Sequence, residues 1–207
     1  MLFDSLALLS LIIVIILLGR LVNIFPSLIA CLIRGKESIN LETSVKLSRD
    51  RNLLTAAMLL PFCLVAYRYS LLIPSFATEP GEATGIGTTV GIFGAYILLR
   101  SLCSFSIRPG KSGTATYNAA VAASRTFFII LTLLLLATDG ILSFIGIAAE
   151  TIRSAMIWIS AAIYLIFLLR KIQIFATSYS FFTVFLYLCA LEIAPTGVLV
   201  TSVMIFK

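Results

Sequence analysis

Two ionisable side chains lie deep within long apolar stretches of this sequence, and they are the first candidates for chemistry. Arg68 lies within the apolar block 53–76, and Glu192 lies within the block 180–205. If these blocks cross a membrane as helices, Arg68 is roughly 22 Å and Glu192 roughly 18 Å from the basic end of its block. Charges at such depth are costly in hydrocarbon. Because their signs are opposite and their depths similar, we predict that the two side chains face the bundle interior and interact, directly or through water.

This intramembrane charge pair has more than one interpretation. A structural pair would only pin two helices together, whereas a functional pair would handle a proton, an ion or a substrate. In a third interpretation, Arg68 extends outward to the headgroups, and Glu192 pairs elsewhere, for example with Arg153.

Three tyrosines accompany the predicted pair. Tyr67 and Tyr69 flank Arg68, and Tyr187 lies just over one helical turn before Glu192. A tyrosine hydroxyl in a membrane usually finds a hydrogen-bond partner, so these groups would be able to solvate the pair. An aromatic belt at the membrane interface explains them equally well.

Prolines and glycines within the blocks predict where helices kink and pack. Pro61 and Pro195 are predicted kinks, and Pro195 would also free a backbone carbonyl near the deep acid. The spacing Gly87-x-x-x-Gly91, with Gly94 beyond it, is typical of helices that approach closely in membranes. We therefore predict that Gly87, Gly91 and Gly94 line a helix–helix contact.

The elements that must position these residues are membrane-spanning helices. Of the 207 residues, 60% are hydrophobic and 12% are charged, which is about half the charged fraction of a soluble domain. A span needs about 20 mostly apolar residues. Six blocks qualify, so we predict one all-α transmembrane bundle over residues 1–207, with spans at about 5–25, 53–76, 85–105, 119–138, 154–169 and 180–205.

The charges between the blocks predict an orientation. Basic residues gather in the first, third and fifth connections, whereas the second holds Glu79 and Glu82 and no base. The positive-inside rule then places both termini outside the cytoplasm. Arg20, Arg100 and Arg125 lie near the cytoplasmic ends of their blocks, where we expect them to reach the headgroups.

Two apolar stretches are open to more than one interpretation. Residues 26–33 follow Pro26 and either extend the first helix beyond a kink or lie in the interface. Residues 141–149 are too short to span and favour a re-entrant or surface helix. If they belonged to a seventh span, the later topology would invert.

The residue inventory excludes several chemistries. There is no His, so a Ser-His or Cys-His mechanism within the chain is excluded. Cys31, Cys63, Cys103 and Cys189 form no C-x-x-C pair and are expected to be buried free thiols. We therefore expect no catalytic residues, no metal and no cofactor. Although the net charge is +6, the cations lie between apolar blocks, which argues against a nucleic-acid partner.

The C-terminal part is similar to a known family. Arg170-Lys171, Phe175, Tyr179 and the run Phe185-Leu-Tyr-Leu-Cys-Ala-Leu-Glu-Ile-Ala-Pro195 resemble the end of small integral membrane proteins of the Bacteroidota, catalogued as a domain of unknown function. The resemblance implies a bacterial inner-membrane location and directs attention to Tyr187, Cys189, Glu192 and Pro195. A His that often precedes this run in the family is absent here.

Three functions are consistent with these observations. The first is a non-enzymatic subunit or assembly factor of a larger inner-membrane complex, for which secretion or membrane-protein biogenesis is the expected context. Its expected partners are the lipid bilayer and other membrane protein subunits. The second is a small ion-coupled transporter with its site at Arg68 and Glu192. The third is a membrane enzyme that modifies lipid, which would need several polar side chains at one interface. The sequence identifies no small-molecule substrate.

Overall fold

The described part of the chain is helical apart from short turns and contains no strand. The computed structural model describes residues 2–33, 45–71, 81–106, 114–176 and 179–205. Its elements are α1 (Leu2–Ile33), α3 (Val45–Arg68), α4 (Glu82–Ser106), α5 (Thr114–Phe144), α6 (Ala149–Ala176), α7 (Phe181–Leu188), the π-helical segment η3 (Cys189–Ile193) and α8 (Ala194–Ile205). The predicted all-α class is confirmed.

Most of these helices match the dimensions of a bilayer. Five stretches are long and apolar enough to cross a membrane, namely Leu2–Cys31, Glu82–Ser104, Thr116–Phe144, Ala149–Ala176 and Phe182–Thr201. The remaining long helix, α3, begins with a charged turn that contains Lys46, Arg49 and Asp50. It packs against α1, α4 and α5, so its neighbours shelter it. The chain is therefore a multi-pass helical membrane protein.

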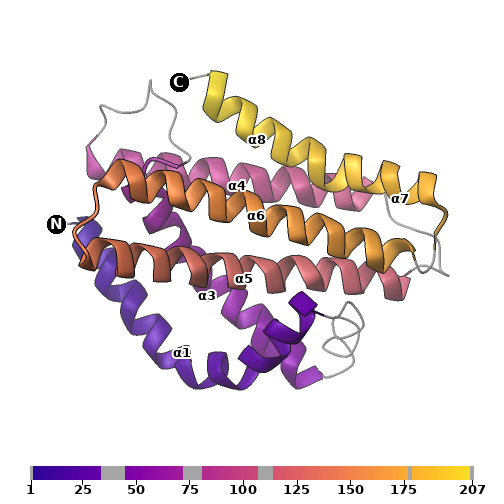
Figure 1. Ribbon diagram of the computed structural model, residues 1–207, viewed down its shortest axis with the longest axis horizontal. Helices are drawn as coiled ribbons and strands as arrows, with labels where there is room; N and C mark the ends of the chain where they lie inside the picture. Colours follow the sequence, from indigo (N-terminus) through magenta and orange to yellow (C-terminus); the bar gives the residue numbers. More distant parts are fainter. Residues whose placement is uncertain (1, 34–44, 72–80, 107–113, 177–178, 206–207) are drawn as a thin grey trace.

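Successive long helices run in opposite directions (Figure 1). The C-terminal ends of α1, α4 and α6 lie on the same side of the molecule. Both chain termini lie towards the opposite side. This arrangement agrees with six passes. Which side faces the cytoplasm stays a prediction, because the arrangement of the helices alone does not assign them to the two sides of a membrane. Arg34, Lys36, Arg108 and Lys111, which support that prediction, lie outside the described residues.

Both ambiguous stretches prove to extend helices. α1 continues through Pro26 to Ile33 without interruption. Residues 141–144 complete α5, and a tight turn with Gly146 at φ +79° then leads directly into α6. The backbone N–H groups of Gly146 and Ile147 donate to the carbonyls of Ser143 and Leu142, which is a Schellman ending. A separate re-entrant helix at 141–149 is therefore wrong, and so is the inversion that a seventh span would cause.

The second helix lies earlier in the sequence than predicted. α3 ends at Arg68, and Ser70 adopts φ 47° in a helix-ending turn whose last hydrogen bond joins the N–H of Leu71 to the carbonyl of Ala66. Residues 72–76 of the predicted span lie outside the described residues. Pro61 does not end the helix, because α3 continues through it. Arg68 consequently lies at a helix end rather than deep within a span.

The predicted glycine contact on α4 does not form among the described residues. A β-carbon added at Gly87, Gly91 or Gly94 would meet no described atom within 4 Å, whereas one added at Gly85 would lie 2.6 Å from the ring of Tyr67. Gly85 therefore permits the close approach of α3 and α4. The packing role of the other three glycines stays a prediction, because their face of α4 points away from the other described helices.

Small and apolar side chains bring α5, α6 and α7 together next to the most polar part of the bundle. Ala119, Ala120 and Ala123 of α5 are buried against Ile174 and Phe175 of α6, together with Val184 of α7. Alanines on one helix face allow the neighbouring backbone to approach closely. The four cysteines are free and helical, as predicted, although Cys103 and Cys189 are only partly buried.

The hairpin of α5 and α6 predicts which ends share a membrane side. Phe144 is 94% exposed at one end of the hairpin, and Ala176 is exposed at the other end. We expect a membrane-impermeant maleimide to label Phe144→Cys in intact spheroplasts, and to label Ala176→Cys only after permeabilisation, with the unsubstituted chain as background. Labelling of both from one side would contradict the hairpin, and the reverse pattern would invert the predicted orientation.

Candidate functional site

A break in regular α-helix places Glu192 inside the bundle. Residues Cys189–Ile193 form a π-helical turn in which the N–H of Ala194 donates to the carbonyl of Cys189. Pro195 follows at once and has no N–H to donate, which removes one α-helical hydrogen bond beside the π-turn. Such π-turns are frequent at functional sites. The result is a carboxylate that is only 2% exposed.

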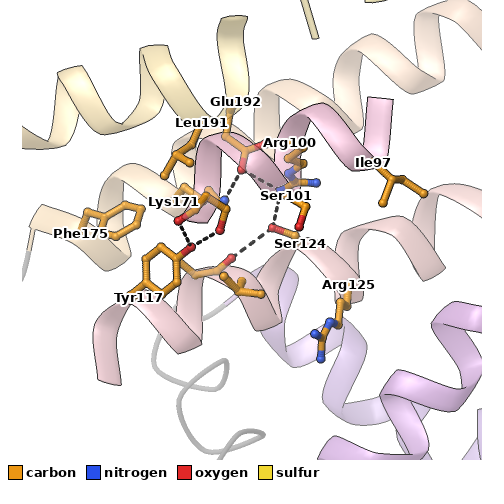
Figure 2. Close-up of a pocket in the computed structure, with 13 residues that line it drawn as sticks. Ile97, Arg100, Ser101, Tyr117, Ser124, Arg125, Lys171, Phe175, Leu191 and Glu192 are labelled. Carbon is orange, nitrogen blue, oxygen red and sulfur yellow. Dashed lines mark hydrogen bonds and ion pairs between the residues drawn. The ribbon is translucent and has the colours of Figure 1, made fainter. Parts of the chain in front are cut away.

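Two cations from two other helices neutralise this carboxylate. Nη2 of Arg100, on α4, donates to Oε1 of Glu192 at 2.7 Å. Nζ of Lys171, on α6, donates to the same oxygen. Figure 2 shows the three side chains converging from three elements. The other oxygen of Glu192, Oε2, is buried without a hydrogen-bond partner among the described residues. We call Glu192, Lys171 and Arg100 the charge cluster.

Aromatic and hydroxyl groups hold the charge cluster in place. The ring of Phe167 lies 5.0 Å from Nζ of Lys171 and 5.8 Å from Cζ of Arg100, within range for cation–π attraction. Nη2 of Arg100 also donates to Oγ of Ser124 at 2.6 Å. The hydroxyl of Tyr164 donates to the backbone carbonyl of Glu192 at 3.1 Å. The cluster therefore ties α4, α5, α6 and the π-turn together.

The charge cluster carries one positive charge in excess. Two cations surround a single carboxylate, and Glu192 is the only acid among the described residues within 4 Å of Arg100 or Lys171. Lys171 and Glu192 are almost fully buried, with side-chain exposures of 5% and 2%, whereas that of Arg100 is 27%. Arg100 is therefore the member that an outside molecule is able to reach.

A cavity adjoins the charge cluster where α4 and α5 face each other (Figure 2). Its volume is about 280 Å³. The hydroxyl of Tyr117 donates across it to the backbone carbonyl of Ser104 at 3.1 Å. Its polar lining comprises Arg100, Ser101, Ser104, Tyr117, Ser124, Arg125, Lys171 and Glu192. This volume is close to the lower limit for small-ligand sites, so the cavity suits a small polar group.

The predicted pairing of Arg68 with Glu192 is wrong. Nη1 of Arg68 donates instead to Oδ2 of Asp139 at 3.3 Å, near the ends of α3 and α5. Glu192 instead shares Arg100 with Ser124, a residue of α5 that lies several turns before Asp139. Arg153, the other partner considered for Glu192, makes no ion pair with it. The two predicted residues therefore belong to two separate ion clusters.

The predicted supporting tyrosines do not solvate Glu192. The hydroxyl of Tyr69 donates to Oδ1 of Asp139 at 2.5 Å, so Tyr69 supports the Arg68 cluster alone. The ring of Tyr67 packs against Phe3, with centroids 6.0 Å apart. Tyr187 stacks on Tyr179 at 6.3 Å, beside Phe175. Tyr164, which the sequence analysis did not select, is the tyrosine that contacts the π-turn.

The true partners of Glu192 were missed for identifiable reasons. Hydropathy alone ends the fifth span at about residue 169 and so places Lys171 in the fifth connection, but α6 continues to Ala176 and includes it. Arg100 was expected to reach the headgroups, but its Nη2 turns inward to Glu192. Arg20 and Arg125 also have protein partners, Asp50 at 3.0 Å and Asn52 at 2.6 Å. A signal is nevertheless present in the sequence. Arg100, Arg125 and Lys171 lie at the basic ends of the third, fourth and fifth predicted spans, and these ends lie on the same side of a six-helix bundle.

These features define the chain as a multi-pass helical membrane protein with a buried ionic site. The chain belongs to the family described as Domain of unknown function (DUF4271), whose profile matches residues 5–203. The match agrees with the resemblance found at the C-terminal part and extends it over nearly the whole chain. No curated protein and no solved structure matches the sequence or the fold.

The charge cluster predicts a specific pattern of stability. Glu192→Leu leaves two cations without a counter-ion, and we expect it to lower the free energy of unfolding by about 3–5 kcal/mol. The double variant Lys171→Met with Glu192→Leu should recover part of that loss, because only the partly exposed Arg100 remains charged. Arg68→Gln, the control in an exposed pair, should cost no more than about 1 kcal/mol.

Reversible unfolding in mixed detergent micelles measures these values. Strictly additive losses for Lys171→Met and Glu192→Leu would contradict the coupling on which the cluster is based.

Proposed function

We propose that this chain is a non-enzymatic subunit or assembly factor of a larger complex in a bacterial inner membrane. The observation that carries the proposal is an unused helix-packing face on α4. Gly87, Gly91 and Gly94 share this face, and none has a described atom within 4 Å of where its β-carbon would lie. In membranes, faces of small residues typically permit close contact with another helix.

The surroundings of the glycine face support this use. Gly87 and Gly91 are exposed, and Leu98, one turn beyond Gly94 on the same face, is 66% exposed. Lipid alone places no requirement on small residues, because acyl chains adapt to any apolar surface. A partner helix benefits from them because its backbone approaches more closely and gains dispersion contacts. The face thus fits a transmembrane helix of another subunit. We propose a secretion or membrane-biogenesis complex as the setting.

The charge cluster supports a non-enzymatic role. Glu192 already accepts two cationic donors through Oε1, so it is poorly placed to act as a general base. The sequence contains no His to take that role. The cluster therefore fits a binding or structural centre better than a reaction centre.

A small ion-coupled transporter is the second candidate, now with its site at Glu192 alone. The cavity that reaches Glu192 and Lys171 favours it, because transport needs a polar site inside the bundle. In proteoliposomes, a transporter would carry protons or ions under a gradient, and Glu192→Gln would abolish the flux. Absence of any flux in the native chain would count against this candidate.

The subunit proposal predicts a face-specific loss of assembly. We expect the tagged chain, purified in mild detergent from its own bacterium, to run in native mass spectrometry at the mass of a complex with a defined partner. Gly87→Leu with Gly91→Leu should remove that partner, because the added side chains block the close approach. Gly19→Leu is the matched control, because Gly19 is an exposed helical glycine on α1, likewise without a neighbour within 4 Å.

Two results would contradict the proposal. One is a chain that runs alone in several mild detergents, and the other is a partner that both sets of variants retain equally.

A further inference from the structure

The cavity beside Arg100 has the charge, donors and position of an anion site. We propose that it binds a phosphate-type anionic group, supplied by a lipid headgroup or by a soluble phosphate. The inference is independent of the proposed subunit role, because it concerns what the isolated chain holds between α4 and α5.

The first argument is the unbalanced charge. The charge cluster contains two cations and one carboxylate, and no other described acid lies within 4 Å of those cations. An uncompensated charge inside a membrane protein is costly, so a counter-ion gains free energy by binding there. Arg125 also lines the cavity, but its guanidinium turns away from the charge cluster to the amide of Asn52 on α3, at 2.6 Å (Figure 2), so the excess charge beside the cavity comes from Arg100 and Lys171.

The second argument is the set of free donors. Every contact that Arg100 makes with described polar groups uses Nη2, so Nε and Nη1 have no such partner. A guanidinium with two open donors matches the oxygens of a phosphate group. Ser101 lines the same space and adds a hydroxyl group, whereas the hydroxyls of Tyr117 and Ser124 already donate to backbone carbonyls. Glu192 and Ser124 hold Arg100 in place through Nη2.

The third argument is depth. α5 has 31 residues and α6 has 28. Their lengths of roughly 46 Å and 42 Å exceed a hydrocarbon core of about 30 Å, so their ends reach the headgroup layers. Lys171 lies roughly 8 Å before the end of α6, and Arg100 roughly 9 Å before the end of α4. The cavity is therefore close to the level of the headgroup phosphates on that side.

The size of the cavity limits the ligand. A volume of about 280 Å³ accommodates one phosphate group with a short substituent, but not acyl chains. A lipid would therefore insert only its headgroup, with its chains remaining in the bilayer. A soluble phosphate monoester would fit without this constraint.

The test uses the full-length chain, purified and delipidated in mild detergent. Phosphatidylglycerol, phosphatidylcholine and inorganic phosphate are titrated separately, and binding is measured from the shift in thermal unfolding. A shift with phosphatidylglycerol but not with inorganic phosphate assigns the site to a lipid headgroup, and the converse assigns it to a soluble phosphate. No shift with either anion overturns the proposal, because the excess charge would then be removed otherwise, for example by loss of a proton from Lys171.

Variants distinguish a specific anion-binding site from non-specific electrostatic attraction. Arg100→Gln should weaken anion binding by about tenfold, because it removes a charge-assisted contact. Glu192→Gln should strengthen binding, because the competing negative charge is gone. Arg68→Gln, at the other end of the bundle, should leave the affinity unchanged. Equal weakening by Arg68→Gln, or weaker binding in a folded Glu192→Gln variant, would overturn the proposal. If Arg100→Gln does not fold, the wild-type titrations and Glu192→Gln decide.

Discussion

The exclusion of unneutralised charge from a bilayer is the constraint on which this structure depends. Glu192 would be expensive to bury alone, and Lys171 would be equally so. Together with Arg100 they form one ionic unit that joins α4, α6 and the π-turn. Removing Glu192 leaves two cations in a low dielectric without a counter-ion, so the acid determines where both cations lie.

The rest of the fold brings these groups to one level. The π-turn, followed by Pro195, changes the helical register so that the side chain of Glu192 points into the bundle. The alanines of α5 allow α6 and α7 to approach, which brings Lys171 within reach of the acid. α4 and α5 stay apart at this level, and the gap becomes the cavity beside Arg100. The same packing that buries the carboxylate therefore leaves an opening to the most exposed cation.

Much of the architecture follows from hydropathy alone, because lipid requires spans of a fixed length. Glu192 was also identifiable, since an acid within an apolar block has few explanations. Its partners were not, because pairing depends on where helices begin and end. α6 extends to Ala176 and includes Lys171, whereas α3 ends at Arg68 and places that residue at a helix end. The glycine spacing of α4 indicates a capacity for close contact but cannot specify the partner, and among the described residues only Gly85 of α4 has a neighbour within 4 Å of its added β-carbon.

The contact between Lys171 and Glu192 is the central claim, and solid-state NMR in lipid bilayers measures it directly. With ¹⁵N in the lysine ammonium groups and ¹³C in the glutamate carboxyl groups, dipolar recoupling reports pairs within ion-pair distance. We predict strong dephasing at the carboxyl carbon of one buried glutamate, and its loss in Lys171→Met. Absence of that dephasing in the wild-type chain, or its persistence in Lys171→Met, would contradict the assignment of the charge cluster.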